Sequence, residues 1–423
     1  MTENKPHSIQ KRMVSNVYSK SYLQSSPEMH KLSQVMIFER LLPIVEAAAV
    51  KKIPTDVLEL NLAAAGDFIN AYLFGLSSST NWLQDIETRK FWLNKHQIRQ
   101  PHRFWPQELP GVSTFLNRFG IHIVPKWIDA ANQEIEAYNL QMCEAAEKST
   151  TEGPTPQSDD EKSFSPPVVW KQLSDSLVTA SSKLPSSTTS PHPHTLRIAT
   201  ELLDHSAAGF DTSGITLTYL FHELSLRPTL QSSLRAELLS LSPHLIYPSH
   251  SHSLPSPRAL DALPLLHAIL METLRLHSVI PGPQPRITPS TPTSLAGSSP
   301  LPGGIRVSAQ AYSLHRNEEI FPSSEEWKPE RWLDAGKEKT AEMMKWFWAF
   351  GSGGRMCIGS NFAMQGKPLF SLLSTTTHIT SSSPFQKSDS SPHQSTQTTP
   401  PTSLTTKASS PLTPTSRLRK RTS

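Results

Sequence analysis

A glycine-rich loop around a single cysteine constrains this chain more than any other feature of its sequence. Residues 348–359 read WAFGSGGRMCIG, with Cys357 two positions after Arg355. The glycines permit backbone conformations with positive φ and let a flat ligand approach the main chain closely. The residues after Cys357 are expected to be helical, and a helix N-terminus favours the thiolate anion. The pattern Phe-Gly-x-Gly-x-Arg-x-Cys-x-Gly fixes six identities in ten positions, so a chance glycine-rich loop beside a buried cysteine is the weaker interpretation.

The overall composition limits the classes of protein that remain. The 423 residues include two cysteines, Cys143 and Cys357, which excludes a disulfide framework. The net charge of +4 is small and the basic residues are scattered, so we expect no nucleic acid as a partner. The basic cluster at 417–421 leaves a basic-tailed nucleic-acid binder as a weak alternative. No apolar stretch approaches the ~20 residues that span a bilayer, and the polar N-terminus has no signal-peptide core.

Hydrophobic periodicity predicts a mainly helical chain. Helices are expected at 32–50, 55–75, 127–148, 196–226, 230–241 and 260–277. In residues 304–312, apolar and polar side chains alternate after a turn at Pro302-Gly303-Gly304, which indicates a half-buried strand. Residues 149–169 and 181–195 are rich in Ser, Thr and Pro and are expected to be loops. The predicted fold class is therefore mainly α with a minor β-sheet.

The cysteine loop resembles the haem-binding signature of the cytochrome P450 family. The resemblance implies that haem, an iron protoporphyrin with an axial cysteine thiolate, is the cofactor and that Cys357 is its metal ligand. It also implies that Arg355 pairs with a haem propionate and that Phe350 and Gly351 pack against the ring. The fold expected from the resemblance is the cytochrome P450 fold, incomplete at both ends.

Residues 208–213 (AGFDTS), inside the helix expected at 196–226, resemble the family's oxygen-activation motif. The hydroxyl of Thr212 can bond to a backbone carbonyl one turn back and open the helix locally. The resemblance implies that Asp211 and Thr212 are the catalytic residues that handle protons. Gly209 is expected to remove a side chain where the helix approaches bound dioxygen.

Two further segments resemble a structural cluster of the family. Glu272 and Arg275 are spaced three apart in a predicted helix, which places both side chains on one face. The resemblance implies that Arg331, in the segment PERW at 329–332, completes a buried cluster with them. One carboxylate shared by two guanidinium groups makes several charge-assisted hydrogen bonds and joins distant segments. An isolated pair at this spacing is usually a solvated helix pair, so the cluster is favoured only by its combination with the cysteine loop.

The resemblance also suggests which residues bind the haem propionates. Arg286 follows the segment PGPQP at 281–285 and resembles the family's propionate-binding arginine. His7, Lys11 and Arg12 lie in a segment that resembles the start of the family's C helix. There, an aromatic or histidine side chain and a basic side chain four residues later meet a propionate. The alternative for this segment is an ordinary basic helix.

Both ends of the chain depart from the family pattern. Residues 1–365 are expected to form the catalytic domain, without the N-terminal membrane anchor and the first helices and strands of the family's microsomal members. The helix after Cys357 is expected to end at Gly366-Lys367-Pro368. Residues 366–423 form a Ser/Thr/Pro-rich tail that buries too little apolar surface to be ordered. The abrupt change of composition suggests a mis-spliced or out-of-frame translation of this tail.

The resemblance implies a monooxygenase that inserts one oxygen atom of O2 into a small apolar organic substrate, using electrons from a flavoprotein reductase. The alternative is a truncated, non-catalytic remnant that binds haem poorly. Microsomal members of the family belong to the endoplasmic reticulum membrane; without the anchor, this chain is expected to be cytoplasmic or peripheral. Its Ser/Pro-rich loops resemble those of filamentous-fungal members, for which secondary metabolism is a common setting.

Overall fold

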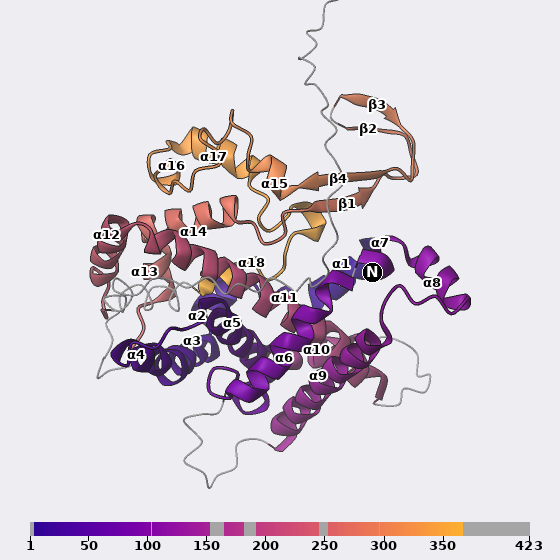
Figure 1. Cartoon of the computed structure of the whole chain (residues 1–423), viewed down its shortest axis with the longest axis horizontal. Coiled ribbons are helices and arrows are strands. Elements are labelled where there is room, and N and C mark those ends of the chain that lie inside the picture. The colour runs from indigo at the N-terminus through magenta and orange to yellow at the C-terminus, as the bar shows by residue number, and fades with distance from the viewer. Residues whose placement is uncertain are drawn as a thin grey trace, which may run out of the picture. The chain divides into compact units, whose positions relative to one another are not determined.

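Helices dominate the described part of the chain, together with two pairs of short strands (Figure 1). A computed structural model describes residues 4–102, 104–152, 165–181, 192–244, 253–295 and 297–366. The tail expected at 366–423 lies outside the described residues except for Gly366, as do most of the expected loops 149–169 and 181–195. Within the described ranges, no helix is both long enough and apolar enough to cross a membrane.

The helices differ widely in length, and prolines and glycines separate many of them. Those before residue 182 are α1 (Asn4–Val14), α2 (Lys20–Ser25), α3 (Pro27–Gln34), η1 (Val35–Leu41), α4 (Leu42–Val50), α5 (Val57–Phe74), η2 (Leu76–Ser78), α6 (Ile86–Ile98), η3 (Gln100–His102), α7 (Phe104–Glu108), α8 (Pro110–Arg118), α9 (Lys126–Glu152) and α10 (Val168–Ser181). Those after it are α11 (His192–Ser225), α12 (Pro228–Leu239), α13 (Pro257–Asp261), α14 (Pro264–Leu276), α15 (Ala311–Leu314), α16 (Glu330–Leu333), α17 (Lys337–Trp346), η5 (Gly353–Arg355) and α18 (Ser360–Gln365).

The helices α5 and α11 form the centre of the hydrophobic core. Every side chain of α5 from Leu60 to Phe74 is buried, including the polar ones of Asn61, Asp67 and Asn70, so this part of the helix has no face in solvent. The two helices pack closely because α11 presents a glycine to α5. A Cβ atom added at Gly214 would lie 2.7 Å from Cδ2 of Leu62 and 2.8 Å from its Cα. A larger residue at this position would push the two helices apart.

The helices expected at 55–75, 127–148, 196–226 and 230–241 correspond to α5, α9, α11 and α12 within a few residues. Capping explains the sharp ends of α5. The side chain of Asp56 accepts a hydrogen bond from the N–H of Glu59 at 3.0 Å, and Gly75 ends the helix with a φ of +83°.

Prolines change two of the expected helices. The helix expected at 260–277 is instead two helices, α13 and α14, because Pro264 lacks an N–H and occupies the first turn of α14. A single helix over these residues was the wrong prediction. The helix expected at 32–50 is present, but α3, η1 and α4 follow one another from Pro27 with a π-helical segment between them. Just before Pro43, the N–H of Leu42 bonds to the carbonyl of Ile37, five residues back.

The strands form two antiparallel pairs. β1 (Pro283–Ile287) pairs with β4 (Arg306–Gln310), and Arg286 lies opposite Val307. β2 (Thr293–Leu295) pairs with β3 (Ser298–Leu301). The strand expected at 304–312 corresponds to β4, whereas β1, β2 and β3 were not predicted. Their short segments contain Pro, Ser and Thr and lack a clear alternation of apolar and polar residues.

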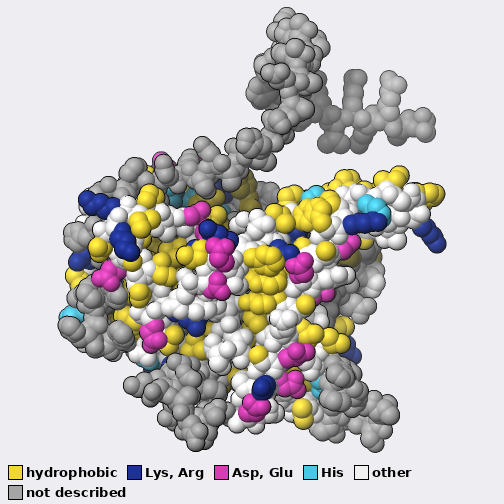
Figure 2. Space-filling model, turned by 60° about the horizontal axis from the view of Figure 1, so that its bottom comes forward, with side chains coloured by type: hydrophobic (Ala, Val, Ile, Leu, Met, Phe, Trp, Pro, Cys, Tyr) yellow, Lys and Arg dark blue, Asp and Glu magenta, His cyan; other side chains and the backbone are white. Residues whose placement is uncertain are grey.

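The segment from α7 to the turn after α8 contributes little to the core. It leaves large apolar side chains in solvent: Phe104, Leu109, Val112, Phe115, Phe119 and Ile121. No residue of α8 is buried. On the face drawn in Figure 2, hydrophobic side chains also reach the surface, among interspersed positive and negative ones. The conformation of this segment therefore depends mainly on local helix contacts.

Candidate active site

Glu272 and Arg275, on α14, form the centre of a buried ion-pair cluster. Both side chains are 0% exposed, and Nε and Nη2 of Arg275 donate to the two carboxylate oxygens at 2.9 and 2.8 Å. Arg331, at the start of α16, donates from Nε to Oε1 of Glu272 at 2.9 Å. The N–H of Lys328 and the indole N–H of Trp332 add two hydrogen bonds, each of 2.9 Å. The structure thus brings the three predicted residues together around one carboxylate.

This cluster holds the main chain as well as side chains. Burial raises the pKa of Glu272, but the hydrogen bonds and positive charges of Arg275 and Arg331 outweigh it and hold that pKa below its ordinary value. Glu272 is therefore ionised at neutral pH. The other N–H groups of Arg275 donate, at 2.8 to 3.0 Å, to the carbonyls of His315, Ser324 and Glu326.

The cysteine loop has a different construction, because its main chain carries the contacts. Gly351 and Gly353 both have a φ of +68°, which a residue with a side chain rarely adopts. The turn is closed by the N–H of Cys357, which donates to the carbonyl of Phe350 at 2.9 Å, and by the N–H of Met356, which donates to Gly353 at 3.0 Å. Phe350 itself is half-buried. The loop therefore folds back on itself immediately before the cysteine.

The Cys357 side chain is exposed, and backbone donors face its sulfur. Desolvation by neighbouring protein atoms raises the pKa of this thiol, and the N–H groups of Gly359 and Ser360 and the charge of Lys11 oppose the rise without cancelling it. The helix α18 begins at Ser360, so the cysteine precedes a helix N-terminus as expected. The donor set favours an anion at this sulfur once a cation binds it.

Helix α1 approaches the cysteine loop from the other end of the sequence. Nζ of Lys11 donates to the carbonyl of Met356 at 2.7 Å and is 3.4 Å from that of Gly354. Burial lowers the pKa of His7, and the charges of Arg355 and Lys11 lower it further, so these three side chains lie near one another. The structure therefore places Lys11 on the loop's main chain, and an ammonium with three N–H groups can serve a further acceptor.

Two of the other predicted propionate residues lie apart from these contacts. Arg12 is exposed and donates to the carbonyl of Ser8, one turn back on its own helix, at 3.1 Å. Arg286 is exposed on β1 and donates to the carbonyl of Pro285 at 2.8 Å. The structure shows no shared contact between them, and their role at a propionate stays a prediction.

The motif at 208–213 lies in the middle of α11. The hydroxyl of Thr212 donates to the carbonyl of Ala208 at 2.8 Å, which is the expected bond one turn back. Asp211 and Thr212 are half-buried, and Ala208 is exposed. A Cβ atom at Gly209 would lie 2.6 Å from Cγ1 of Ile69 on α5, so this glycine allows the two helices to pack closely. The expected approach of the helix to dioxygen at Gly209 stays a prediction.

Tyr18 connects α11 with the helix that follows the cysteine. Its hydroxyl is hydrogen-bonded to Nδ1 of His205 on α11 at 2.9 Å, and its carbonyl accepts from the side chain of Asn361 on α18 at 3.1 Å. Burial raises the pKa of Tyr18, and a negative charge on Cys357 raises it further. Cys357 and the part of α11 just before residues 208–213 are therefore both near one buried tyrosine.

Two side-chain features were missed by the sequence analysis. Tyr18 is one of them. The other is His315, which is 0% exposed and hydrogen-bonded both to the carbonyl of Arg275 and to the N–H of Trp348. Neither residue belongs to a recognisable motif, and their partners lie far away in the sequence, so no local signal could have identified them.

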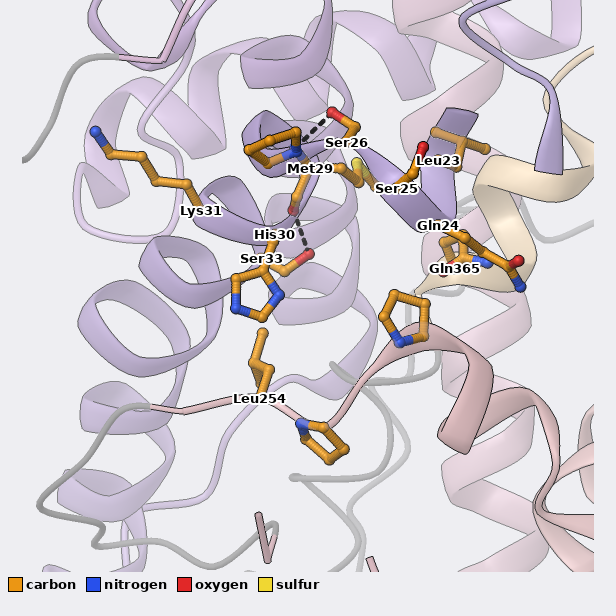
Figure 3. A pocket seen from close by; sticks show the side chains of 13 residues that line it. Leu23, Gln24, Ser25, Ser26, Met29, His30, Lys31, Ser33, Leu254 and Gln365 are labelled. Carbon is orange, nitrogen blue, oxygen red and sulfur yellow. Dashed lines mark hydrogen bonds between the residues drawn. The ribbon is translucent and has the colours of Figure 1, made fainter. Parts of the chain in front are cut away.

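A cavity of about 300 Å³ lies elsewhere, between α2, α3 and the residues before α13. Figure 3 shows that its polar side chains include Ser26 and Ser33, both hydrogen-bonded to the main chain of Met29. Its lining includes no residue of 348–359 or 208–213.

Among the described residues, no group of three or more His, Cys, Asp and Glu side chains is arranged to hold a metal ion.

Comparisons with known proteins agree with the geometry. The family model for cytochrome P450 matches residues 170–402. Over 378 residues, the chain is 31% identical to the cytochrome P450 monooxygenase avaI of Aspergillus versicolor, which covers 87% of this chain and 80% of the relative. The cytochrome P450 monooxygenases orf2 of Aspergillus niger and ankB of Aspergillus thermomutatus are 36% and 37% identical over 157 and 164 residues, and each alignment spans 29% of the relative.

These relatives are fungal, as the resemblance suggested. The mainly helical fold with a small antiparallel sheet is also the one expected from it. Family match, relatives and fold together show that the chain belongs to the cytochrome P450 family.

Proposed function

We propose that this chain is a haem-dependent monooxygenase in which Cys357 is the axial ligand of the iron. The observation that carries the proposal is the exposed cysteine at the end of a tight glycine turn, with two backbone N–H groups facing its sulfur. The second cysteine, Cys143, is buried at 0% exposure, and burial raises its pKa to about 12. The two thiols are thus distinguished by their surroundings alone.

The residues around Cys357 fit a flat, anionic cofactor. A Cβ atom at Gly353 or Gly354 would meet no atom within 4 Å, so the loop leaves open space on that side. Positive side chains are close by, since Lys11 and Arg355 both act on the charge of His7. When bound, haem supplies an iron that activates O2, and a thiolate ligand favours cleavage of the O–O bond. We assign the propionates to Arg355, His7 and Lys11, with Arg286 and Arg12 as further candidates.

The residues on α11 control protons. The one hydroxyl proton of Thr212 is donated to the carbonyl of Ala208, so the lone pairs of the hydroxyl oxygen can accept hydrogen bonds. It can donate to a ligand only after it turns away from that carbonyl. Asp211, the preceding residue, is half-buried and can pass a proton from solvent to Thr212, which replaces the one that Thr212 gives up. The substrate is a small apolar organic molecule, and electrons come from a flavoprotein reductase. A place in fungal secondary metabolism fits the origin of the relatives.

A spectrum of the reduced, CO-bound chain after haem-replete expression tests the proposal. We expect the Soret band at the position specific for a thiolate ligand, its loss in Cys357→Ser, and its retention in Cys143→Ala. Cys143→Ala is the matched control because it removes the only other thiol. Absence of the thiolate band after haem-replete expression would instead favour a non-catalytic protein that does not hold haem through Cys357.

A further inference from the structure

His315 joins the buried Glu272 cluster to the cysteine loop. It lies just after α15 and has no exposed surface. One ring nitrogen, Nδ1, is 2.7 Å from the carbonyl oxygen of Arg275, and the other, Nε2, is 2.7 Å from the backbone nitrogen of Trp348. A carbonyl can only accept and an N–H can only donate, so the two partners fix the tautomer. Nδ1 carries the proton and Nε2 is the acceptor.

The surroundings keep this ring neutral and oriented. It stacks on Phe347, with centroids 5.4 Å apart and planes at 21°, and meets Phe321 edge-on at 6.4 Å. Burial lowers the pKa of His315 to about 4, and its hydrogen bond to Arg275 only partly offsets this. A protonated ring would lose the acceptor that Trp348 needs.

The chain of hydrogen bonds continues from His315 to the cysteine. The carbonyl of Trp348 accepts from the N–H of Gly351 at 3.0 Å, and Gly351 is the first left-handed residue of the loop. The carbonyl of Phe350, next to it, accepts from the N–H of Cys357 at 2.9 Å. At the other end, Arg275 is the residue whose guanidinium holds Glu272. From Trp348 to Cys357 the hydrogen bonds join main-chain atoms, so a shift at Trp348 moves the loop's backbone.

We propose that His315 is a positioning residue that transfers the fixed position of the Glu272 cluster to the turn carrying Cys357. By accepting the hydrogen bond from the N–H of Trp348, His315 fixes the position and orientation of the Cys357 sulfur. This inference rests on the proposed function of Cys357 as a haem ligand. It assigns the histidine an effect on iron ligation that ring packing alone would not produce.

Three substitutions separate positioning from packing. His315→Gln keeps an acceptor near the place of Nε2, His315→Asn keeps a donor near the place of Nδ1, and His315→Phe keeps only the ring. We expect the thiolate-ligated fraction in the reduced-CO spectrum to be close to wild type in His315→Gln. In His315→Asn and His315→Phe it should fall by about tenfold, the effect of leaving one buried donor without its acceptor.

A packing role predicts a different order. If the ring matters only as a filler, His315→Phe keeps both the highest unfolding temperature and the thiolate band, and that result would overturn the proposal. The matched control is His277→Gln, since His277 is bonded through Nε2 to Glu223 at 2.7 Å and stacked on Tyr219, without any contact to the loop among those described. It should leave the thiolate band unchanged.

A variant at Trp348 tests the same hydrogen bond from the donor's side. Trp348→Pro removes the N–H that His315 accepts and leaves the buried cluster intact, and Phe347, with φ of −79° and ψ of 104°, already suits a following proline. We expect the same loss of thiolate ligation. If wild type shows a Cys357-dependent band and Trp348→Pro keeps it, the positioning role is wrong. If wild type shows no such band, the proposed function fails and this inference fails with it.

Discussion

The Glu272 cluster and the cysteine loop are built in opposite ways, one from buried side chains and the other from main-chain contacts around an exposed side chain. In the cluster, charged side chains are removed from water and hydrogen bonds from Arg275, Arg331, Lys328 and Trp332 compensate the carboxylate. In the loop, the cysteine side chain is exposed and the contacts are made by the main chain. The cluster is rigid because it is over-determined, whereas the loop is shaped by two glycines and by donors from distant segments. The exposed Cys357 can keep a fixed position because the residues that support its loop are buried.

The largest expected effect comes from breaking the buried side of this comparison. Glu272→Gln leaves two guanidinium groups without their carboxylate in a site where the side chains of Glu272 and Arg275 have no exposed surface. We expect the free energy of unfolding to fall by about 3–5 kcal/mol, measured by urea denaturation. The matched control is Glu325→Gln, since Glu325 also pairs with an arginine, Arg316, but is 68% exposed. Its effect should stay below about 1 kcal/mol, and equal losses in the two variants would contradict the cluster's special role.

The pH dependence of stability tests the residue between the two regions. The folded pKa of His315, about 4, lies below the 6.5 of an ordinary histidine. The unfolded chain therefore takes up a proton before the folded chain does, and stability falls as the pH drops from about 6.5 to about 4. The lost stability is about 3 kcal/mol. In His315→Gln this contribution disappears, so its unfolding free energy should depend less steeply on pH in that window. Parallel curves for the two proteins would show that His315 titrates normally.

A smaller effect is expected from changing the backbone of the open loop. Gly351→Ala forces a side chain onto a residue with φ of +68° and places its Cβ 3.0 Å from Oε1 of Gln284. We expect a loss of about 1–2 kcal/mol in unfolding free energy, together with a weaker thiolate band. Gly354→Ala is the control within the same loop, because its Cβ would meet nothing within 4 Å and its φ is not positive. A larger loss of unfolding free energy in Gly354→Ala than in Gly351→Ala would contradict the described turn.

Local signals account for the parts of the fold that were predicted correctly. Asp56 and Gly75 bound α5 through contacts within one turn, and the alternation of residues 304–312 reports on β4 directly. The Glu272 cluster could be predicted because its three residues belong to motifs that resemble those of a known family. The contact of Gly209 with Ile69 could not be predicted, because Ile69 lies on α5 and is far away in the sequence. His315 and Tyr18 were missed for the same reason, since their importance arises only where the chain folds back on itself.

Iron X-ray absorption on the haem-loaded chain tests most directly whether the supported loop presents Cys357 to the metal. We predict one sulfur scatterer in the first coordination sphere of wild type and of Cys143→Ala, and none in Cys357→Ser. A sulfur ligand that persists in Cys357→Ser, or its absence from haem-loaded wild type, would contradict the assignment of Cys357.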